Sequence, residues 1–198
     1  MKRAVLLHLA GLFALLGGCG LLQPKPADPV RQALWEQRRA ALGELAEWQA
    51  KGSASFVSDI TGWSATYRWK QAGDRYDILL IAPLGQGRFM IQGDSAYVTV
   101  RDSKGGQFSG ADPAAMLLES LKVEVPVLAM RYWVLGLPRP GSDYRVELDE
   151  QGRPQQLEQD AWRIDYSDYD ADLPGKVLML REPYRIKLSV RDWQSPRG

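Results

Sequence analysis

Apolar and polar residues alternate strictly along most of this chain after residue 50, and this pattern restricts the fold more than any other feature. In segment 63–70, Trp, Ala, Tyr and Trp alternate with Ser, Thr, Arg and Lys, and segments 144–149, 162–167 and 186–191 repeat the alternation. A period of two is typical of antiparallel strands with one dry face and one wet face. Counting such segments predicts about eleven strands, separated by short turns that contain glycine or aspartate. The pattern favours a mainly β (α+β) protein, built as a barrel or half-barrel with an apolar concave side.

Three segments carry helical signals and precede or interrupt the strands. Asp28-Pro29 and Asp112-Pro113 each combine an N-cap residue with a proline that suits the first helical turn. Segment 126–135 is apolar almost all round, which predicts an enclosed helix over one mouth of the curved sheet. The helix after Pro29 is expected to pack through a stripe at helical spacing, formed by Val30, Leu34, Ala41, Leu45 and Trp48. The sequence thus predicts helices that cover one side of the sheet.

The N-terminal segment has the features of a bacterial lipoprotein leader. Lys2 and Arg3 precede an apolar run over residues 4–16, and small residues lead to Cys19. The run is too short to span a bilayer comfortably, so a retained transmembrane helix is disfavoured. Its end, Leu-Gly-Gly-Cys, resembles the lipobox, in which the cysteine is lipidated and becomes the first mature residue. An ordinary secretory leader with a chance cysteine is the alternative.

These signals divide the chain into three parts. Residues 1–18 are expected to be a cleaved signal peptide, and Cys19 the site of lipid attachment. Residues 19–28 contain two prolines and are expected to form a short, stiff lipidated tether. Residues 29–198 are expected to form one β-barrel domain, since about 170 residues suit a single core. Gly20 stands where an aspartate would resemble an inner-membrane retention signal, so the lipobox pattern implies sorting to the outer membrane.

Cysteine and histidine usage excludes most catalytic and metal sites. The chain has one cysteine and one histidine, Cys19 and His8, and both precede the predicted domain. Without them, Ser/His/Asp catalysis, Cys/His catalysis and imidazole metal sites are excluded. The acidic run at 165–172 begins like a calcium loop, but Leu173 and Met179 stand where glycine and glutamate are needed. We therefore expect no metal, no cofactor and no enzyme, although carboxylates alone can catalyse some hydrolyses.

The charge balance argues against a nucleic-acid partner. The chain carries 25 basic and 24 acidic residues, and two of the basic residues, Lys2 and Arg3, lie in the predicted leader. A mature chain so close to neutral exerts no strong attraction on a polyanion.

One turn between two predicted strands carries an apolar residue at its tip. Residues 78–82 form a β-prone run, and Pro83, Leu84 and Gly85 follow it before the next strand. Proline cannot donate to a strand ladder and glycine admits positive φ, so the chain is expected to turn here. Turn tips are usually polar, and nothing local can bury the leucine. We interpret Pro83, Leu84 and Gly85 as a membrane-insertion loop that holds the leucine towards a lipid surface.

The apolar concave side of the sheet is a second candidate site. A cavity for acyl chains would be lined by aromatic and aliphatic residues at strand spacing. The candidate lining residues are Phe56, Trp63, Tyr67, Trp69, Val146, Trp162, Ile164 and Leu188. The same residues could equally fill a solid core, and composition does not separate the two interpretations.

Several segments, in order along the mature chain, resemble the LolB family of outer-membrane lipoprotein receptors. The resemblance is carried by Trp35 with Leu42, Leu45 and Trp48, by Trp63 to Trp69 with Gln71, by Pro83-Leu84-Gly85, by Pro126-Val127, by Trp133 to Pro138, by Gln159 with Trp162 and Tyr166, and by Lys187-Leu188 with Trp193. The order and spacing of these segments are more specific than any one of them. One departure is Arg38, because relatives often carry a histidine after Trp35.

The resemblance implies a fold, a function and partners. The implied fold is an incomplete antiparallel β-barrel with helices closing one side, related to the fold of LolA-type carriers. The implied function is to accept lipoproteins from a LolA-like periplasmic carrier in an apolar cavity and to insert them into the outer membrane, with Leu84 as the inserting residue. The expected partners are this carrier, the acyl chains of client lipoproteins and the periplasmic face of the outer membrane, and the protein is expected to be monomeric. The alternative is a structural outer-membrane lipoprotein that scaffolds envelope assembly and has a filled interior.

Overall fold

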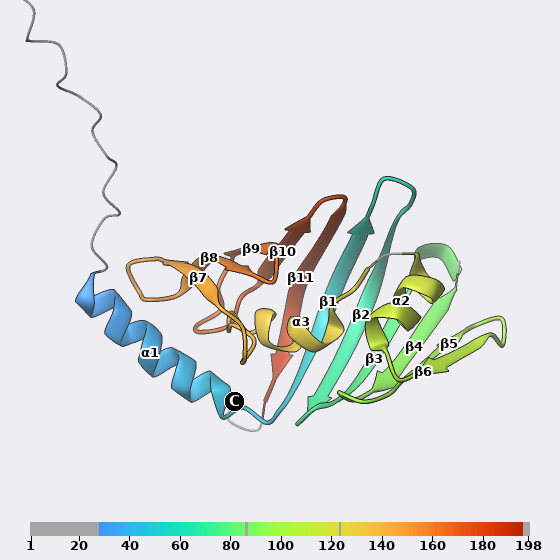
Figure 1. The fold of residues 1–198 in the computed structure, drawn as a ribbon, viewed down its shortest axis with the longest axis horizontal. Coiled ribbons are helices and arrows are strands. Elements are labelled where there is room, and N and C mark those ends of the chain that lie inside the picture. The colour runs from blue at the N-terminus through green and yellow to red at the C-terminus, as the bar shows by residue number, and fades with distance from the viewer. Residues whose placement is uncertain (1–27, 86, 123, 196–198) are drawn as a thin grey trace, which may run out of the picture.

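A single open β-sheet forms the body of the computed structural model, which describes residues 28–85, 87–122 and 124–195. Eleven antiparallel strands follow the order β6-β5-β4-β3-β2-β1-β11-β10-β9-β8-β7, so β6 and β7 are the edges (Figure 1). The strands are β1 (Glu47–Val57), β2 (Gly62–Ala72), β3 (Arg75–Ile81), β4 (Arg88–Gly93), β5 (Val98–Asp102), β6 (Gln107–Gly110), β7 (Tyr144–Leu148), β8 (Pro154–Gln159), β9 (Trp162–Ser167), β10 (Lys176–Arg181) and β11 (Tyr184–Gln194). The prediction of an incomplete antiparallel β-barrel of about eleven strands is confirmed.

Alternation along the strands gives the sheet one buried face and one solvent-facing face. In β2, Ala65, Tyr67 and Trp69 are buried, whereas Arg68 and Lys70 are exposed. Since β2 pairs with both β1 and β3 without a register shift, the buried positions line up across the three strands. The buried face of these strands is therefore one continuous apolar surface.

Two short helices cover this buried face (Figure 1). The first, α2 (Pro113–Leu121), begins at Asp112, whose carboxylate accepts a hydrogen bond from the Ala115 N–H at 3.1 Å. The second, α3 (Val127–Trp133), buries Val127, Ala129, Met130 and Trp133. It is followed by Gly136 at φ 75°, a left-handed conformation that suits glycine. The prediction that helices cover one side of the sheet is confirmed.

The N-terminal helix, α1 (Pro29–Gly43), does not pack through the stripe that its sequence suggested. Val30 and Leu34 are 66% and 38% exposed. Leu45 lies beyond the helix, and Trp48 belongs to β1. The predicted stripe was wrong because its helical spacing was continued across the end of the helix into a strand. None of the described helices is long and apolar enough to cross a membrane.

The buried side of α1 is formed by Trp35 and Arg38. The helix rests on the turn between β7 and β8, where a Cβ atom at Gly152 would lie 3.0 Å from the Trp35 backbone nitrogen. Only glycine leaves room for so close an approach. The contact surface of α1 is thus set by loops distant in sequence and not by the apolar face of the sheet.

Candidate functional site

The turn between β3 and β4 presents Leu84 to solvent. The Ala82 N–H donates a hydrogen bond to the Gly87 carbonyl at 2.9 Å and closes the turn around the 3-10 segment Pro83–Gly85. Leu84 has φ 54° and ψ 28°, which is the left-handed region, and it is 96% exposed. The structure therefore places an aliphatic side chain at the tip of the turn. Its insertion into a membrane stays a prediction.

Leu84→Gly is expected to raise the free energy of unfolding by up to about 1 kcal/mol. A left-handed backbone costs an L-residue roughly 1–2 kcal/mol, and the greater freedom of glycine in the unfolded chain offsets part of the gain. Urea unfolding of the two proteins measures the difference. A less stable glycine variant would show that the leucine contributes packing despite its exposure. A leucine that is both strained and exposed does not stabilise the fold, so we expect it to be present for a functional reason.

An apolar cavity lies between the sheet and the helices that cover it. It is lined by Ala54, Phe56, Tyr67, Trp69, Ile78, Leu80, Ile91 and Leu188 from the sheet, and by Leu117, Val125, Val127 and Met130 from the helical side. Its volume is about 30 Å³, which holds roughly two water-sized spheres. The apolar cavity expected from the sequence is therefore present, but in this conformation it is too small to hold an acyl chain.

The cavity wall carries no charge. Tyr67 and Trp69 supply the only polar side-chain atoms among the residues that line it. The Trp69 indole N–H donates to Gln71 Oε1 at 2.9 Å, so it is already satisfied. Burial raises the pKa of the Tyr67 hydroxyl well above its usual range, against the lowering effect of Arg191. A neutral wall of this kind favours hydrocarbon over polar ligands.

Half of the candidate lining residues meet at this cavity, namely Phe56, Tyr67, Trp69 and Leu188. Trp63 lies next to the cavity, because its half-buried ring stacks on that of Phe56 with 4.4 Å between the centroids. Trp162 and Ile164 are buried in β9 and do not line the cavity. Val146 is half-buried on the edge strand β7 and does not line it either. The structure therefore assigns these last three residues to a separate part of the core.

The lining residues predicted from the sequence did not include the helical part of the cavity wall. Leu117 comes from α2, Val127 and Met130 come from α3, and Val125 lies in the link between the helices. The apolar face of α2 was visible as helical spacing. Which apolar residues of α3 face the sheet was not visible, because that helix is apolar on most sides.

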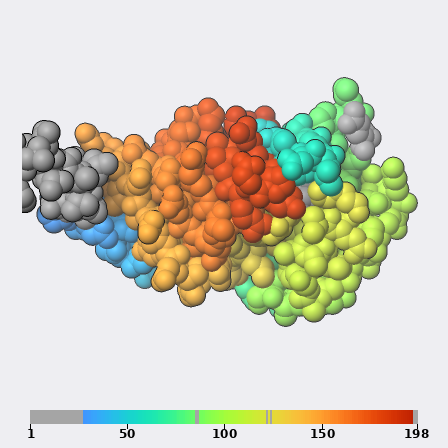
Figure 2. Space-filling view, turned by 45° about the horizontal axis from the view of Figure 1, so that its top comes forward, coloured from blue at the N-terminus to red at the C-terminus, as the bar shows by residue number. Residues whose placement is uncertain are grey.

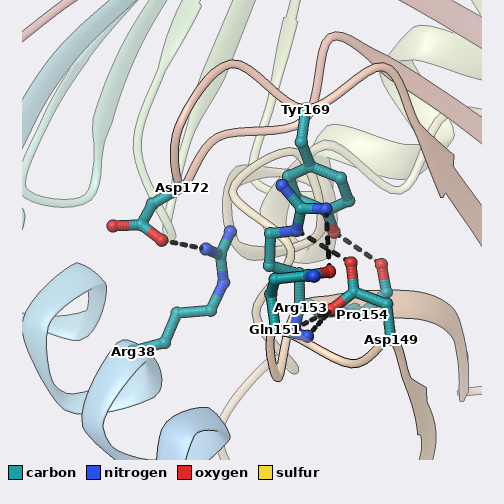
Figure 3. Close-up of polar contacts among 7 residues, drawn as sticks. All are labelled: Arg38, Asp149, Gln151, Arg153, Pro154, Tyr169 and Asp172. Atoms are coloured by element: carbon teal, nitrogen blue, oxygen red, sulfur yellow. Dashed lines mark hydrogen bonds and ion pairs between the residues drawn. The ribbon is translucent and has the colours of Figure 1, made fainter.

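A buried arginine attaches α1 to the loop that follows β9 (Figure 3). Arg38 Nη1 donates to the Asp172 carboxylate at 2.7 Å, and the Arg38 guanidinium lies 5.3 Å from the centroid of the Tyr169 ring. Arg153 also stacks on Tyr169, at 4.7 Å, and pairs with Asp149 at 2.8 Å. Burial lowers the pKa of Arg38, and the Asp172 carboxylate partly counters this effect. None of these residues lines the cavity, so the cluster is a structural attachment.

Comparison with known proteins connects this geometry to one family. A sequence model described as outer membrane lipoprotein LolB matches residues 46–193. Relatives named outer-membrane lipoprotein LolB include a protein of Nitrosococcus oceani, 37% identical over 91% of this chain and 92% of the relative. A second, from Chromohalobacter salexigens, is 35% identical over 92% of this chain and 87% of the relative. The chain belongs to the LolB family.

The match to the family model covers the Leu84 turn and the whole cavity wall, but it begins after α1, so Arg38 lies outside that model match. The alignments with the two relatives extend over 91% and 92% of the chain. The predicted signal peptide and Cys19 lie outside the described residues. Among solved structures, a putative outer membrane lipoprotein-sorting protein domain from Vibrio parahaemolyticus has a TM-score of 0.45 and 10% identity, covering 84% of this chain and 92% of that one. A likeness at that level carries no argument about function.

Proposed function

We propose that the protein is an outer-membrane receptor that accepts lipoproteins from a soluble periplasmic carrier and inserts them into the outer membrane. Membership of the LolB family supports this place in the lipoprotein localisation pathway. The main support for the proposal is the uncharged apolar cavity between the sheet and two short helices. Leu84 is exposed at one end of the strands that form the cavity wall. Lipid on Cys19 would hold the receptor at the periplasmic face of the membrane.

The hydrophobic effect explains why such a receptor needs a cavity. Exposing three acyl chains of about fifteen methylenes each to water costs on the order of 35 kcal/mol, at roughly 0.8 kcal/mol per methylene. Client lipids must therefore pass from the carrier cavity to the receptor cavity and then to the bilayer. A preference of about 1.4 kcal/mol at each step shifts the partition tenfold. Transfer of this kind breaks no bond and consumes no nucleotide.

Loading requires α2 and α3 to move away from the sheet, because a cavity of about 30 Å³ holds no acyl chain. Within the described residues, no side-chain hydrogen bond or ion pair joins these helices to strands β1 to β4. The polar contacts of α3 reach the β2–β3 turn, from Arg131 to the Gly73 carbonyl at 3.4 Å, and β8, from Trp133 to Gln159 Oε1 at 2.8 Å, so α3 stays attached there when the rest of the cover moves. Apolar contact with the sheet can be exchanged for contact with an acyl chain at little net cost. The helices are thus suited to act as a cover.

A hand-off assay with the domain that begins after Cys19 tests the proposal. A carrier loaded with labelled lipoprotein is expected to lose its cargo to this domain, since the fold and its cavity lie within residues 28–195. Ala54→Leu is expected to lower this acceptance, and the affinity for a fluorescent fatty-acid probe, about tenfold. The larger side chain occupies the cavity, at a cost in stability of roughly 1–3 kcal/mol.

The matched control is Ser53→Leu, which makes the same side chain at the next residue of β1 but on the exposed face. This variant is expected to accept lipoproteins and bind the probe as the parent does. Equal behaviour of the Ala54 and Ser53 variants would show that the cavity is not the acyl site. A parent domain that neither binds the probe nor takes cargo would refute the receptor and favour the scaffold alternative.

A further inference from the structure

Four exposed aliphatic side chains gather at one end of strands β1 to β4. Leu84 and Ile60 are 96% and 84% exposed, more than any other large apolar residue in the described part of the chain. Ile81 and Val57 are 47% and 44% exposed, and each lies three residues before one of these two tips. Single exposed aliphatic residues are ordinary on protein surfaces, but a group of four is not. We call these four residues the apolar end.

The strand pairing places the turns that carry Ile60 and Leu84 at the same end of the strands. β1 leads into the turn at residues 58–61, and β3 leads into the turn at residues 82–87. Both strands pair antiparallel with β2, which lies between them. They therefore run in the same direction and end on the same side of the sheet. Both turns lie along the upper edge of the sheet in Figure 1. Figure 2 shows the turquoise β1–β2 turn beside the green β3–β4 turn.

An aromatic cluster connects the cavity to the apolar end. Phe56 lines the cavity and stacks on Trp63, and the Trp63 ring lies 6.5 Å from that of Phe89 between centroids. The last residue of β3, Ile81, pairs with Thr66, so β2 extends beyond β3 and Trp63 stands in this overhang. Trp63 and Phe89 are only half-buried. They lie beside the cavity wall on the side of the two tips, and we call them the Trp63–Phe89 rim.

Cations border the apolar end on the outer face of the sheet. Cross-strand pairing places Arg185 beside the half-exposed valine and Arg88 beside the half-exposed isoleucine. Neither guanidinium forms an ion pair with another described residue, and Lys104 adds an exposed ammonium in the next turn at this edge. Asp59 and Glu182 are the acidic residues in the turns around them. Unpaired guanidinium groups can donate hydrogen bonds to the phosphates of lipid headgroups.

We propose that the β1–β2 turn is a second membrane-contacting tip, and that Ile60 enters the phospholipid surface together with Leu84. This inference rests on the proposed function and adds a residue and an orientation to it. One inserted side chain leaves the receptor free to tilt and rotate, whereas two tips bordered by arginines define how it stands on the bilayer. In that orientation the Trp63–Phe89 rim faces the lipid, and an acyl chain leaves the cavity between the tips.

Fluorescent labels on the full-length protein test the contact directly. Cys19 is the only cysteine, and the proposed lipid attachment blocks its thiol, so Ile60→Cys, Leu84→Cys and Tyr97→Cys each offer one reactive site. Tyr97 is a matched control, because it is 51% exposed in the β4–β5 turn at the opposite end of the sheet. In vesicles of phosphatidylethanolamine and phosphatidylglycerol, labels at 60 and 84 are expected to brighten and to be quenched by lipid-borne quenchers. The label at 97 should stay in water.

Delivery provides the functional test. Ile60→Asp is expected to slow the release of a labelled lipoprotein into the same vesicles about tenfold. Acceptance from the carrier should be unchanged, because the side chain lies outside the cavity wall. Tyr97→Asp should deliver as the parent does. Omitting phosphatidylglycerol is expected to weaken the quenching of both tip labels, since the arginines then meet fewer anionic headgroups.

Each alternative outcome overturns a different statement. A label at 60 that stays in water while the label at 84 is quenched, or normal delivery by Ile60→Asp, overturns the second tip and leaves the receptor function standing. A label at 60 that is shielded only when the carrier is added makes the turn a protein contact and also overturns it. Failure of the parent domain in the hand-off assay would instead remove the proposed function on which this inference rests.

Discussion

Replacing Leu84 with glutamate is expected to reduce delivery of lipoproteins into the membrane about 100-fold or more, with the fold intact. Transfer of a leucine side chain into lipid contributes roughly 1.5–3 kcal/mol, and a carboxylate in the bilayer costs about 2.5–3.5 kcal/mol. Each 1.4 kcal/mol corresponds to about a tenfold change, so a partly inserted tip accounts for two orders of magnitude. The residue is 96% exposed, so no core contact is lost. Release of labelled lipoprotein into vesicles measures the effect.

Two further measurements separate insertion from loading. Acceptance of lipoprotein from the carrier should be nearly unchanged in Leu84→Glu, because Leu84 does not line the cavity. Leu84→Ala should be milder, since it removes apolar area without adding a charge. Normal delivery by a folded Leu84→Glu protein would refute the membrane-insertion loop. Loss of acceptance with normal urea unfolding would make the turn part of the carrier contact.

Gln159→Leu is expected to lower the free energy of unfolding by about 3–5 kcal/mol, since several buried polar groups lose their partner at roughly 1–3 kcal/mol each. Gln159 is buried, and its Oε1 accepts hydrogen bonds from the Trp133 indole at 2.8 Å and from the Arg139 N–H at 2.7 Å. Its Nε2 donates to the Arg139 carbonyl at 2.8 Å and to Ser142 Oγ at 2.9 Å. The residue therefore ties the end of α3 and the loop after it to β8.

The matched control is Gln155→Leu, on the same strand with its side chain exposed. This variant is expected to unfold within about 0.5 kcal/mol of the parent in urea. Equal unfolding of both variants would show that Gln159 does not hold α3 in place. Because α3 is part of the cover, a destabilised Gln159→Leu protein should also expose the cavity more often, which raised hydrogen exchange in α3 would report.

Local chemistry explains which features could be predicted. Side chains alternate between the two faces of a pleated strand, so the sequence alone predicted which residues of β2 and β9 lie on each face. Asp28 and Asp112 cap their helices because a carboxylate can reach a free N–H within the next three residues. The tip position of Leu84 follows likewise from its neighbours Pro83 and Gly85. Such signals span only a few residues, and distant parts of the chain do not change them.

Features that depend on docking could not be predicted in the same way. Trp35 and Arg38 are buried because loops from beyond residue 148 pack on α1. The residues near Trp35 and Arg38 in the sequence do not predict this contact. Trp162 and Tyr67 have the same strand spacing, yet only Tyr67 lines the cavity. Trp162 packs instead against Trp133 of α3, with 6.1 Å between the ring centroids.

The sequence by itself determined a mostly antiparallel β protein, its helix starts, its exposed leucine turn and its resemblance to the LolB family, because each depends on residue types at short spacing. Tertiary structure alone decided that the cavity has a volume of about 30 Å³, and that Ile60 and Leu84 lie at the same end of the strands. Both depend on how strands and helices far apart in the chain are placed beside one another. Side-chain periodicity records which face a residue takes, but not what is packed against that face.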